Sequence, residues 1–286
     1  MRSIPSAFVS ILIAVPAFAQ DKVTLRLKFV PGHVVHTLQA QDMTMNMDMG
    51  GQKMNQAMSI QMWTEAKISD VKDGVAAVEH AYKRLKVKSD TPKIDYDSDV
   101  EGSKAGMLAS MSKLVGQKVT VKVDESSNLK DVSMPEDLAD DLERGGVNLK
   151  EGFEQSVMAF PAGPIAIGES WTTTREMTMG QMGTMKTKVT NKLIDVKDNV
   201  ATIEQKMEMD EAGSKLMPGM KVQITKATGL AKIDLRSGIP IDMATDMAMK
   251  MGDAMTMSTR STTKQIEPPA PKNEPPKTEA PKTGGK

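Results

Sequence analysis

Methionine is the residue of this chain whose number and spacing could do chemistry. The 286 residues contain 26 Met and no Cys, and in the segment 43–49 every second residue is Met, with polar residues between. A thioether is a soft ligand that suits Cu(I), and oxidants convert it to a sulfoxide. Metal handling and oxidant scavenging are therefore two hypotheses for the Met-rich segments.

Packing is the competing interpretation of the same residues. The two-residue spacing recurs in the segments 177–179 and 247–251, so Met is spread over many predicted strands and is not gathered at one point. Because Met fills irregular space and accepts varied apolar partners, we interpret the Met faces first as core and second as an adaptable surface for an apolar ligand. The residues that we expect to line such a ligand are Met43, Met45, Met58, Ile60 and Met62.

Groups for other chemistry are sparse in the sequence. The chain has only three His and no G-x-S-x-G, phosphate-loop or H-E-x-x-H motif. His33 and His36 would point to opposite faces of a strand, which is wrong for binding one metal ion. His80 stands in the outward register of an alternating segment, so we predict a solvated side chain. We expect no catalytic residues, no cofactor and no metal ligands.

An acidic run at 95–101 has the spacing of a calcium loop. An EF-hand loop requires Gly at its sixth position and Glu at its twelfth, and these positions hold Val100 and Gly106. We interpret the run as a solvated acidic loop, with a looser Ca²⁺ site as the alternative.

The start of the chain is typical of a secretory signal. Arg2 precedes the apolar stretch 8–15, and Ala17 and Ala19 form an A-x-A cleavage site. We predict a signal peptide at 1–19, cleavage near Ala19, and a soluble product in the periplasm or outside the cell. The absence of Cys excludes disulfides, a lipid-modified cysteine and thiolate zinc sites.

The end of the chain and the overall charge bear on partners. Residues 267–286 are rich in Pro, Lys and Glu, with little to bury, and we predict a disordered tail that acts as a spacer or contacts an envelope component. Lys and Arg total 37, equal to Asp and Glu, so no excess charge favours nucleic acid. No later segment approaches the length of a transmembrane helix.

Two similar segments organise the region between these ends. Residues 70–80 and 195–205 match almost residue for residue, each with a Lys-Asp-Gly or Lys-Asp-Asn corner between alternating segments. Gly and Asn accept the positive φ of a tight hairpin turn. We therefore predict a mainly β fold of two related halves, 20–160 and 161–266, whose long antiparallel hairpins form a curved sheet or half-barrel.

A small helical insert is predicted at about 103–158. Met107, Met111 and Leu114 recur at helical spacing and end at Gly116. A second helix should start at a capping box in 133–136, share the buried face of Leu138 and Leu142, and break at Gly145 and Gly146. A third should run from about Lys150 to Met158.

Four carboxylates recur at equivalent positions of the two similar segments, namely Asp70, Glu79, Asp195 and Glu204. The repeated fold explains this recurrence more simply than catalysis does. An enzymatic function would require these carboxylates to converge in one deep pocket.

The segments 160–171, 176–179 and 195–198 resemble a family of exported bacterial proteins of unknown function. The likeness lies in a GxxW start to a long strand at Trp171, Met/Thr-rich hairpins and a central helical insert. It implies a fold and no activity. The first half departs from the pattern, since it has Val35 where the second half has the Trp.

The leading hypothesis is a non-enzymatic envelope binding or scaffold protein that holds an apolar or lipid-like ligand on a Met-rich sheet face. The alternative is a periplasmic Met-rich protein that handles Cu(I) or scavenges oxidants.

Overall fold

A computed structural model describes residues 22–268, except 104–108, 146–147, 179–182 and 218–220. Within that part of the chain, 13 strands form a single sheet, and every pair of neighbouring strands is antiparallel. The prediction of a mainly β fold with few helices is confirmed. The predicted signal segment, Met107, Gly146 and nearly all of the predicted tail lie outside the described residues.

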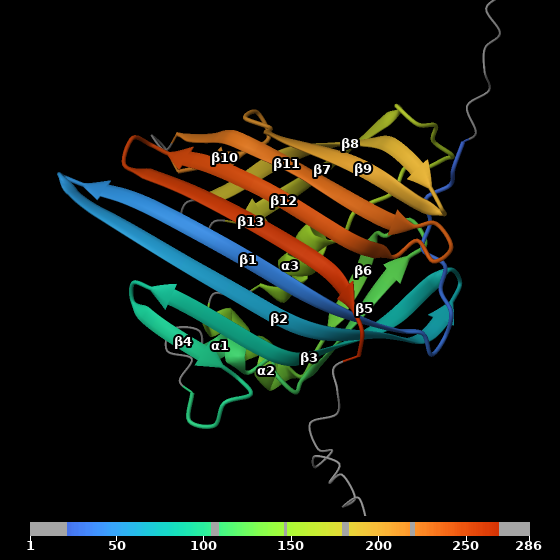
Figure 1. The fold of residues 1–286 in the computed structure, drawn as a ribbon, viewed down its shortest axis with the longest axis horizontal. Helices are drawn as coiled ribbons and strands as arrows, with labels where there is room; N and C mark the ends of the chain where they lie inside the picture. The colour runs from blue at the N-terminus through green and yellow to red at the C-terminus, as the bar shows by residue number, and fades with distance from the viewer. Residues whose placement is uncertain (1–21, 104–108, 146–147, 179–182, 218–220, 269–286) are drawn as a thin grey trace, which may run out of the picture.

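The sheet is open, twisted and curved (Figure 1). Its strand order is β10-β8-β9-β11-β12-β13-β1-β2-β3-β5-β6, with β4 beside β3 and β7 beside β8. The strands are β1 (Val34–Met49), β2 (Gln52–Lys72), β3 (Val75–Asp90), β4 (Lys93–Asp97), β5 (Lys118–Asp124), β6 (Leu129–Ser133), β7 (Ser170–Thr178), β8 (Gly183–Lys197), β9 (Val200–Met209), β10 (Lys215–Leu216), β11 (Val222–Asp234), β12 (Pro240–Met251) and β13 (Met255–Ile266).

The two similar segments form hairpins with the same turn. Asp73 and Gly74 have φ of 51° and 76°, and Asp198 and Asn199 have φ of 51° and 62°. Positive φ at both central residues is the type I′ geometry that matches the twist of a two-residue hairpin. The predicted hairpin corners are thus confirmed.

The strands around these hairpins also share their register. A bulge interrupts β2 and β3 between Ile68 and Asp70, and another interrupts β8 and β9 between Leu193 and Asp195, at the equivalent position. Ala76 of β3 pairs with Val123 of β5, and the equivalent Ala201 of β9 pairs with Ile233 of β11. Small and β-branched side chains therefore fill the same inner positions in both groups of strands.

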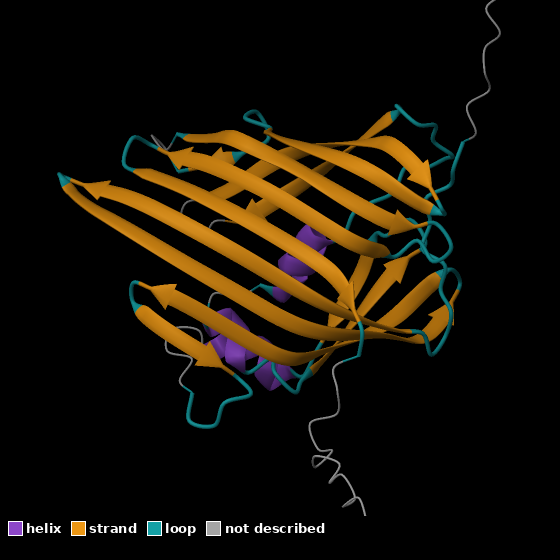
Figure 2. Cartoon of the chain, viewed as in Figure 1, coloured by secondary structure: helices purple, strands orange, loops and turns teal. Residues whose placement is uncertain are grey.

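Three helices lie against one side of the sheet, as Figure 2 shows: α1 (Ala109–Ser112), α2 (Glu136–Arg144) and α3 (Leu149–Ser156). Leu138 and Leu142 share the buried face of α2, as predicted, and Gly145 follows its last residue. None of the described helices is long and apolar enough to cross a membrane.

The starts and lengths of the helices differ in part from the sequence predictions. The predicted capping box of α2 is wrong: Pro135 occupies the N-cap position, and no side chain caps the helix. A proline ring has no oxygen that could accept from the first turn, so the cap position loses its usual acceptor. The first helix ends at Ser112, before the predicted end at Gly116, and its predicted start at Met107 lies outside the described residues.

One core cluster, which we call the Met core, consists mainly of Met side chains. Met185 of β8 and Met249 of β12 are buried at 0% and 2% exposure and pack with Val222 of β11. Met177 and Met247 pack against this cluster. At this end of the sheet the Met side chains close on one another, so their role there is packing.

Candidate apolar ligand-binding cavity

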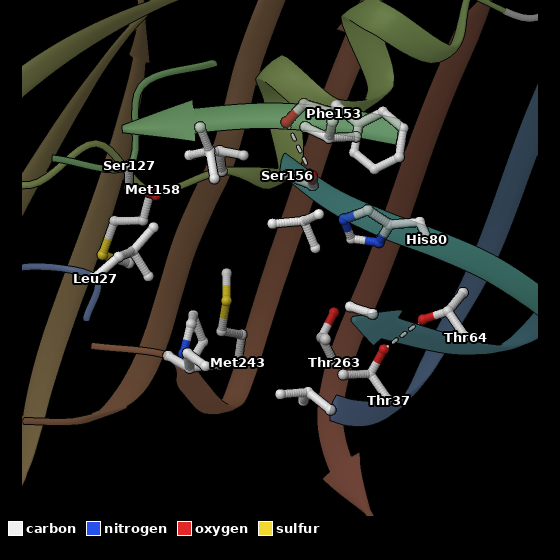
Figure 3. Close-up of a pocket in the computed structure, with 18 of the residues that line it drawn as sticks. Leu27, Thr37, Thr64, His80, Ser127, Phe153, Ser156, Met158, Met243 and Thr263 are labelled. Atoms are coloured by element: carbon white, nitrogen blue, oxygen red, sulfur yellow. Dashed lines mark hydrogen bonds between the residues drawn. The ribbon is translucent and has the colours of Figure 1, made fainter. Parts of the chain in front are cut away.

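A cavity of about 410 Å³ lies between the inner face of the sheet and helix α3 (Figure 3). Strands β1, β2, β3, β5, β12 and β13 form its floor, and α3 with the segment 27–29 forms the opposite wall. Its lining residues include Leu27, Thr37, Thr64, His80, Ser127, Phe153, Ser156, Met158, Met243 and Thr263.

The alternation of the strands decides which residues line this cavity. Val35, Thr37 and Gln39 all line it, because residues two apart on β1 share a face. The register then sets Thr64 of β2 opposite Thr37 and Met62 opposite Gln39. Odd-numbered residues of β1 and the β2 residues opposite them therefore form this part of the cavity floor.

Hydrogen bonds and packing hold the chain just after α3. The partly buried guanidinium of Arg175 donates to the Val157 carbonyl oxygen at 2.9 Å, and burial lowers its pKa. The Trp171 indole donates to the Ala159 carbonyl oxygen, also at 2.9 Å. Both donors come from β7, so β7 fixes the position of the wall that carries Met158.

Three of the hydroxyls at the cavity are already hydrogen-bonded. The hydroxyls of Thr37 and Thr64 hydrogen-bond to each other at 2.6 Å, and the Ser156 hydroxyl donates to the Phe153 carbonyl oxygen at 2.9 Å (Figure 3). A Thr or Ser side chain whose hydroxyl is already hydrogen-bonded presents mainly its carbon atoms to an occupant of the cavity. The cavity is thus apolar in effect even where its residues are not.

His80 lies in this cavity, so the prediction that it is solvated is wrong. It shares the inner face of β3 with Val78 and Tyr82, and its ring packs against Phe153 of α3 with centroids 5.0 Å apart. Burial lowers the pKa of His80 to about 4 and raises that of Tyr82 to about 12. The imidazole is therefore neutral at neutral pH.

The five residues predicted from the sequence to line a ligand are distributed along the sheet. Met62 lines the cavity, whereas Met58 and Ile60 pack with the core around Leu85. Met43 and Met45 lie farther along β1, opposite Met58 and Gln56 of β2. Contact between a ligand and these residues stays a prediction. Met158, Met243 and Phe153 line the cavity but were not selected, because their position depends on contacts between distant segments.

The candidate acidic and histidine sites are not assembled. Asp97 is buried and accepts hydrogen bonds from the Arg84 guanidinium at 2.5 and 3.0 Å, which holds its pKa near 2, so it is not part of a solvated loop. Asp70 and Asp195 are exposed beside separate hairpin turns. Among the described residues, no group of three or more His, Cys, Asp or Glu could hold a metal ion.

His36 is the polar group that the described structure leaves without a hydrogen bond. Its buried Nδ1 has no hydrogen-bond partner among the described residues, and it lies 3.8 Å from a carboxylate oxygen of Glu65. It lies on the opposite face of β1 from Thr37, outside the cavity.

Comparison with known families gives one match. Residues 141–240 match the model of a family of unknown function, DUF6263. The match confirms the resemblance to a family of unknown function, and it spans α3 and the strands from β7 to β11. No curated protein matches the chain.

Similar solved structures are distant. The structure described as "Lipid-protein interactions in lipovitellin" is 13% identical with a TM-score of 0.47, and the match covers 86% of this chain and 27% of that chain. This chain thus spans about a quarter of that one. The structure of DynF from the dynemicin biosynthesis pathway of Micromonospora chersina is 10% identical with a TM-score of 0.20, and 94% of each chain is covered. Neither likeness indicates a function.

Proposed function

We propose that this protein is a non-enzymatic binding protein that holds an apolar or lipid-like ligand in the cavity beneath α3. The observation that carries this proposal is a cavity of about 410 Å³ with mainly aliphatic, Met and Phe walls. Sites for small organic ligands are typically about 300–1,000 Å³ and mostly apolar, with a few polar groups.

The charges around the cavity favour an amphiphilic occupant. His80 is neutral because burial lowers its pKa to about 4, so it adds no charge to the interior at neutral pH. Lys28 also lines the cavity, and its exposed ammonium group donates to the Leu235 carbonyl oxygen at 3.0 Å. An acyl chain inside, with a polar or anionic headgroup near Lys28, fits this distribution.

The Met residues of the lining suit a ligand of variable shape. Met62, Met158 and Met243 enter from β2, from the chain after α3 and from β12. Unbranched thioether side chains adapt to differently bent chains at low cost. This favours a class of lipid-like ligands over one rigid molecule.

Gly152 of α3 offers a direct test. It lines the cavity, and a Cβ placed on it would meet no atom within 4 Å. We expect Gly152→Leu to occupy part of the cavity and to weaken binding of a fluorescent fatty acid by about tenfold, equivalent to about 1.4 kcal/mol. Gly163→Leu is the matched control, because Gly163 is also in open space but does not line the cavity.

Delipidated protein provides the second measurement. A bound lipid should raise its melting temperature in proportion to occupancy, and native mass spectrometry should detect the complex. The proposal fails if no fatty acid, phospholipid or lysophospholipid raises the melting temperature, or if Gly152→Leu binds the fatty acid as tightly as the unmodified chain.

We also infer export, on the basis of the signal-like segment 1–19. N-terminal sequencing of the protein from cell fractions is the test, and we expect a mature chain that begins near Gln20 in a non-cytoplasmic fraction. An intact Met1 in the cytoplasm would contradict the inference.

A further inference from the structure

Four Met side chains stand in register across four neighbouring strands at the far end of the sheet. Met47 of β1 pairs with Met54 of β2 on one side and with Met255 of β13 on the other. Met255 pairs in turn with Met251 of β12. We call these four residues the Met row.

The register brings the thioethers of the Met row within reach of one another. Directly opposite residues of antiparallel strands have Cβ atoms about 4.5–5.5 Å apart and lie on the same face. Three flexible torsions in each Met side chain allow the sulfurs of neighbouring residues to converge on one point. The row therefore places soft donors from four strands along one line.

The Met row is more accessible than the Met core, since Met54 is exposed and Met47, Met251 and Met255 are half-buried. A hollow of about 440 Å³ is lined by Met47, Met54 and Met255, and Met54 is 40% exposed. Met185 and Met249, by contrast, are at most 2% exposed within a packed cluster. Met251 packs against the Met core, whereas Met47, Met54 and Met255 belong to none of the described core clusters, so core packing does not explain these three.

The charged residues at this hollow are not donors to the Met row. Asp48 and Lys53 line it, but they alternate with Met47 and Met54 along β1 and β2 and pair with each other across the strands, so they lie on the opposite face of the sheet. The donors of the Met row are therefore neutral thioether sulfurs, which suit a soft monovalent cation.

We propose that the Met row is a binding site for Cu(I), coordinated by the thioether sulfurs of Met47, Met54 and Met255. The site is separate from the apolar cavity. Met47 lies eight positions beyond Gln39 on β1, about 27 Å along an extended strand from the cavity. Binding of copper and binding of a lipid-like ligand can therefore be tested independently.

The test is anaerobic titration of the full chain with Cu(I) in competition with a chromogenic chelator. We expect one Cu(I) per chain, bound more tightly than by free methionine. The triple variant Met47→Leu, Met54→Leu and Met255→Leu keeps the apolar volume and removes the sulfurs. We expect it to weaken Cu(I) binding by at least about tenfold.

The matched control removes as many partly exposed sulfurs elsewhere on the sheet. Met177→Leu, Met207→Leu and Met209→Leu lie on β7 and β9, and this triple variant should keep the affinity of the unmodified chain. X-ray absorption at the copper edge should show sulfur neighbours, and the Met-row variant should lose them. Circular dichroism checks that both variants are folded.

Three outcomes would overturn the proposal. One is an affinity of the unmodified chain no tighter than that of free methionine. Another is unchanged Cu(I) binding by the Met-row variant, and the third is an equal loss in both triple variants, which would indicate general Met content and not a site.

Discussion

The imidazole of His80 packs against the ring of Phe153 with their centroids 5.0 Å apart and their planes tilted by 56°. His80 belongs to β3 and Phe153 to α3, so this contact joins the sheet to the helix at the edge of the cavity. A neutral ring suits this contact, because protonation would place a charge among apolar side chains. The stability of the cavity wall is therefore linked to pH.

We expect the free energy of unfolding to fall as the pH drops from about 6.5 to about 4. Burial lowers the pKa of His80 from the usual 6.5 of histidine to about 4, so the unfolded chain binds more protons in this window. The loss attributable to His80 has an upper limit of about 3.5 kcal/mol, at about 1.4 kcal/mol per pKa unit. Urea denaturation at a series of pH values measures it.

The variant His80→Leu separates the contribution of His80 to the pH dependence of stability from the contributions of other titratable groups. His80→Leu should flatten the pH dependence in that window, while His33→Gln, at an exposed position, should leave it unchanged. Asp97 acts in a lower window, because its pKa is near 2 and its stabilisation is lost only below about pH 4. An unchanged slope in His80→Leu would show that His80 is not the titrating group.

A buried amide pair should make a second measurable contribution. The side-chain amide of Gln205 donates to the side-chain oxygen Oδ1 of Asn191 at 2.7 Å, and the two residues are 5% and 1% exposed. Asn191→Leu leaves a buried amide without its acceptor, so we expect a loss of about 1–3 kcal/mol in the free energy of unfolding.

The control for this pair is an amide pair on the surface of the sheet. Asn55 donates to Asn46 at 2.8 Å on the surface, and Asn55→Leu should change the free energy of unfolding by less than about 0.5 kcal/mol. The double variant Asn191→Leu and Gln205→Leu should lose less than the sum of the two single variants, since no amide is then left unpaired. Additive losses would contradict the coupling.

The repeated hairpin turn gives a third prediction. Gly74 has φ of 76°, and Asn199 occupies the equivalent place with φ of 62°. Gly74→Ala should lower the free energy of unfolding by about 1–2 kcal/mol, because a Cβ disfavours the left-handed region. Asn199→Gly should be neutral or stabilising, and thermal denaturation compares them. A destabilised Asn199→Gly would mean that its side chain, and not its backbone, matters.

Local chemistry explains why the hairpins were predictable. The corners at Gly74 and Asn199 are set by residues that accept positive φ, and alternation of Met and polar residues identifies the two faces of β1. The shared burial of Leu138 and Leu142 follows from helical spacing in the same way. These features can be predicted because they depend only on residues close together in the sequence.

Features that depend on distant segments were not predictable. His80 was placed outward because alternation reports two faces but not which one α3 covers, and that depends on Phe153. The Met row depends on pairing between β1 and β13, which joins Met47 to Met255. No spacing within either strand reveals that partnership.

Exposure should order the oxidation of the methionines. Met54 is 40% exposed, whereas Met185 and Met249 are 0% and 2% exposed. Under mild hydrogen peroxide, peptide mass spectrometry should find sulfoxide at Met54 well before Met185 and Met249, because reaction requires access to the sulfur. In urea the three should oxidise at similar rates, which controls for intrinsic reactivity. Early oxidation of Met185 in the folded chain would show that the Met core opens.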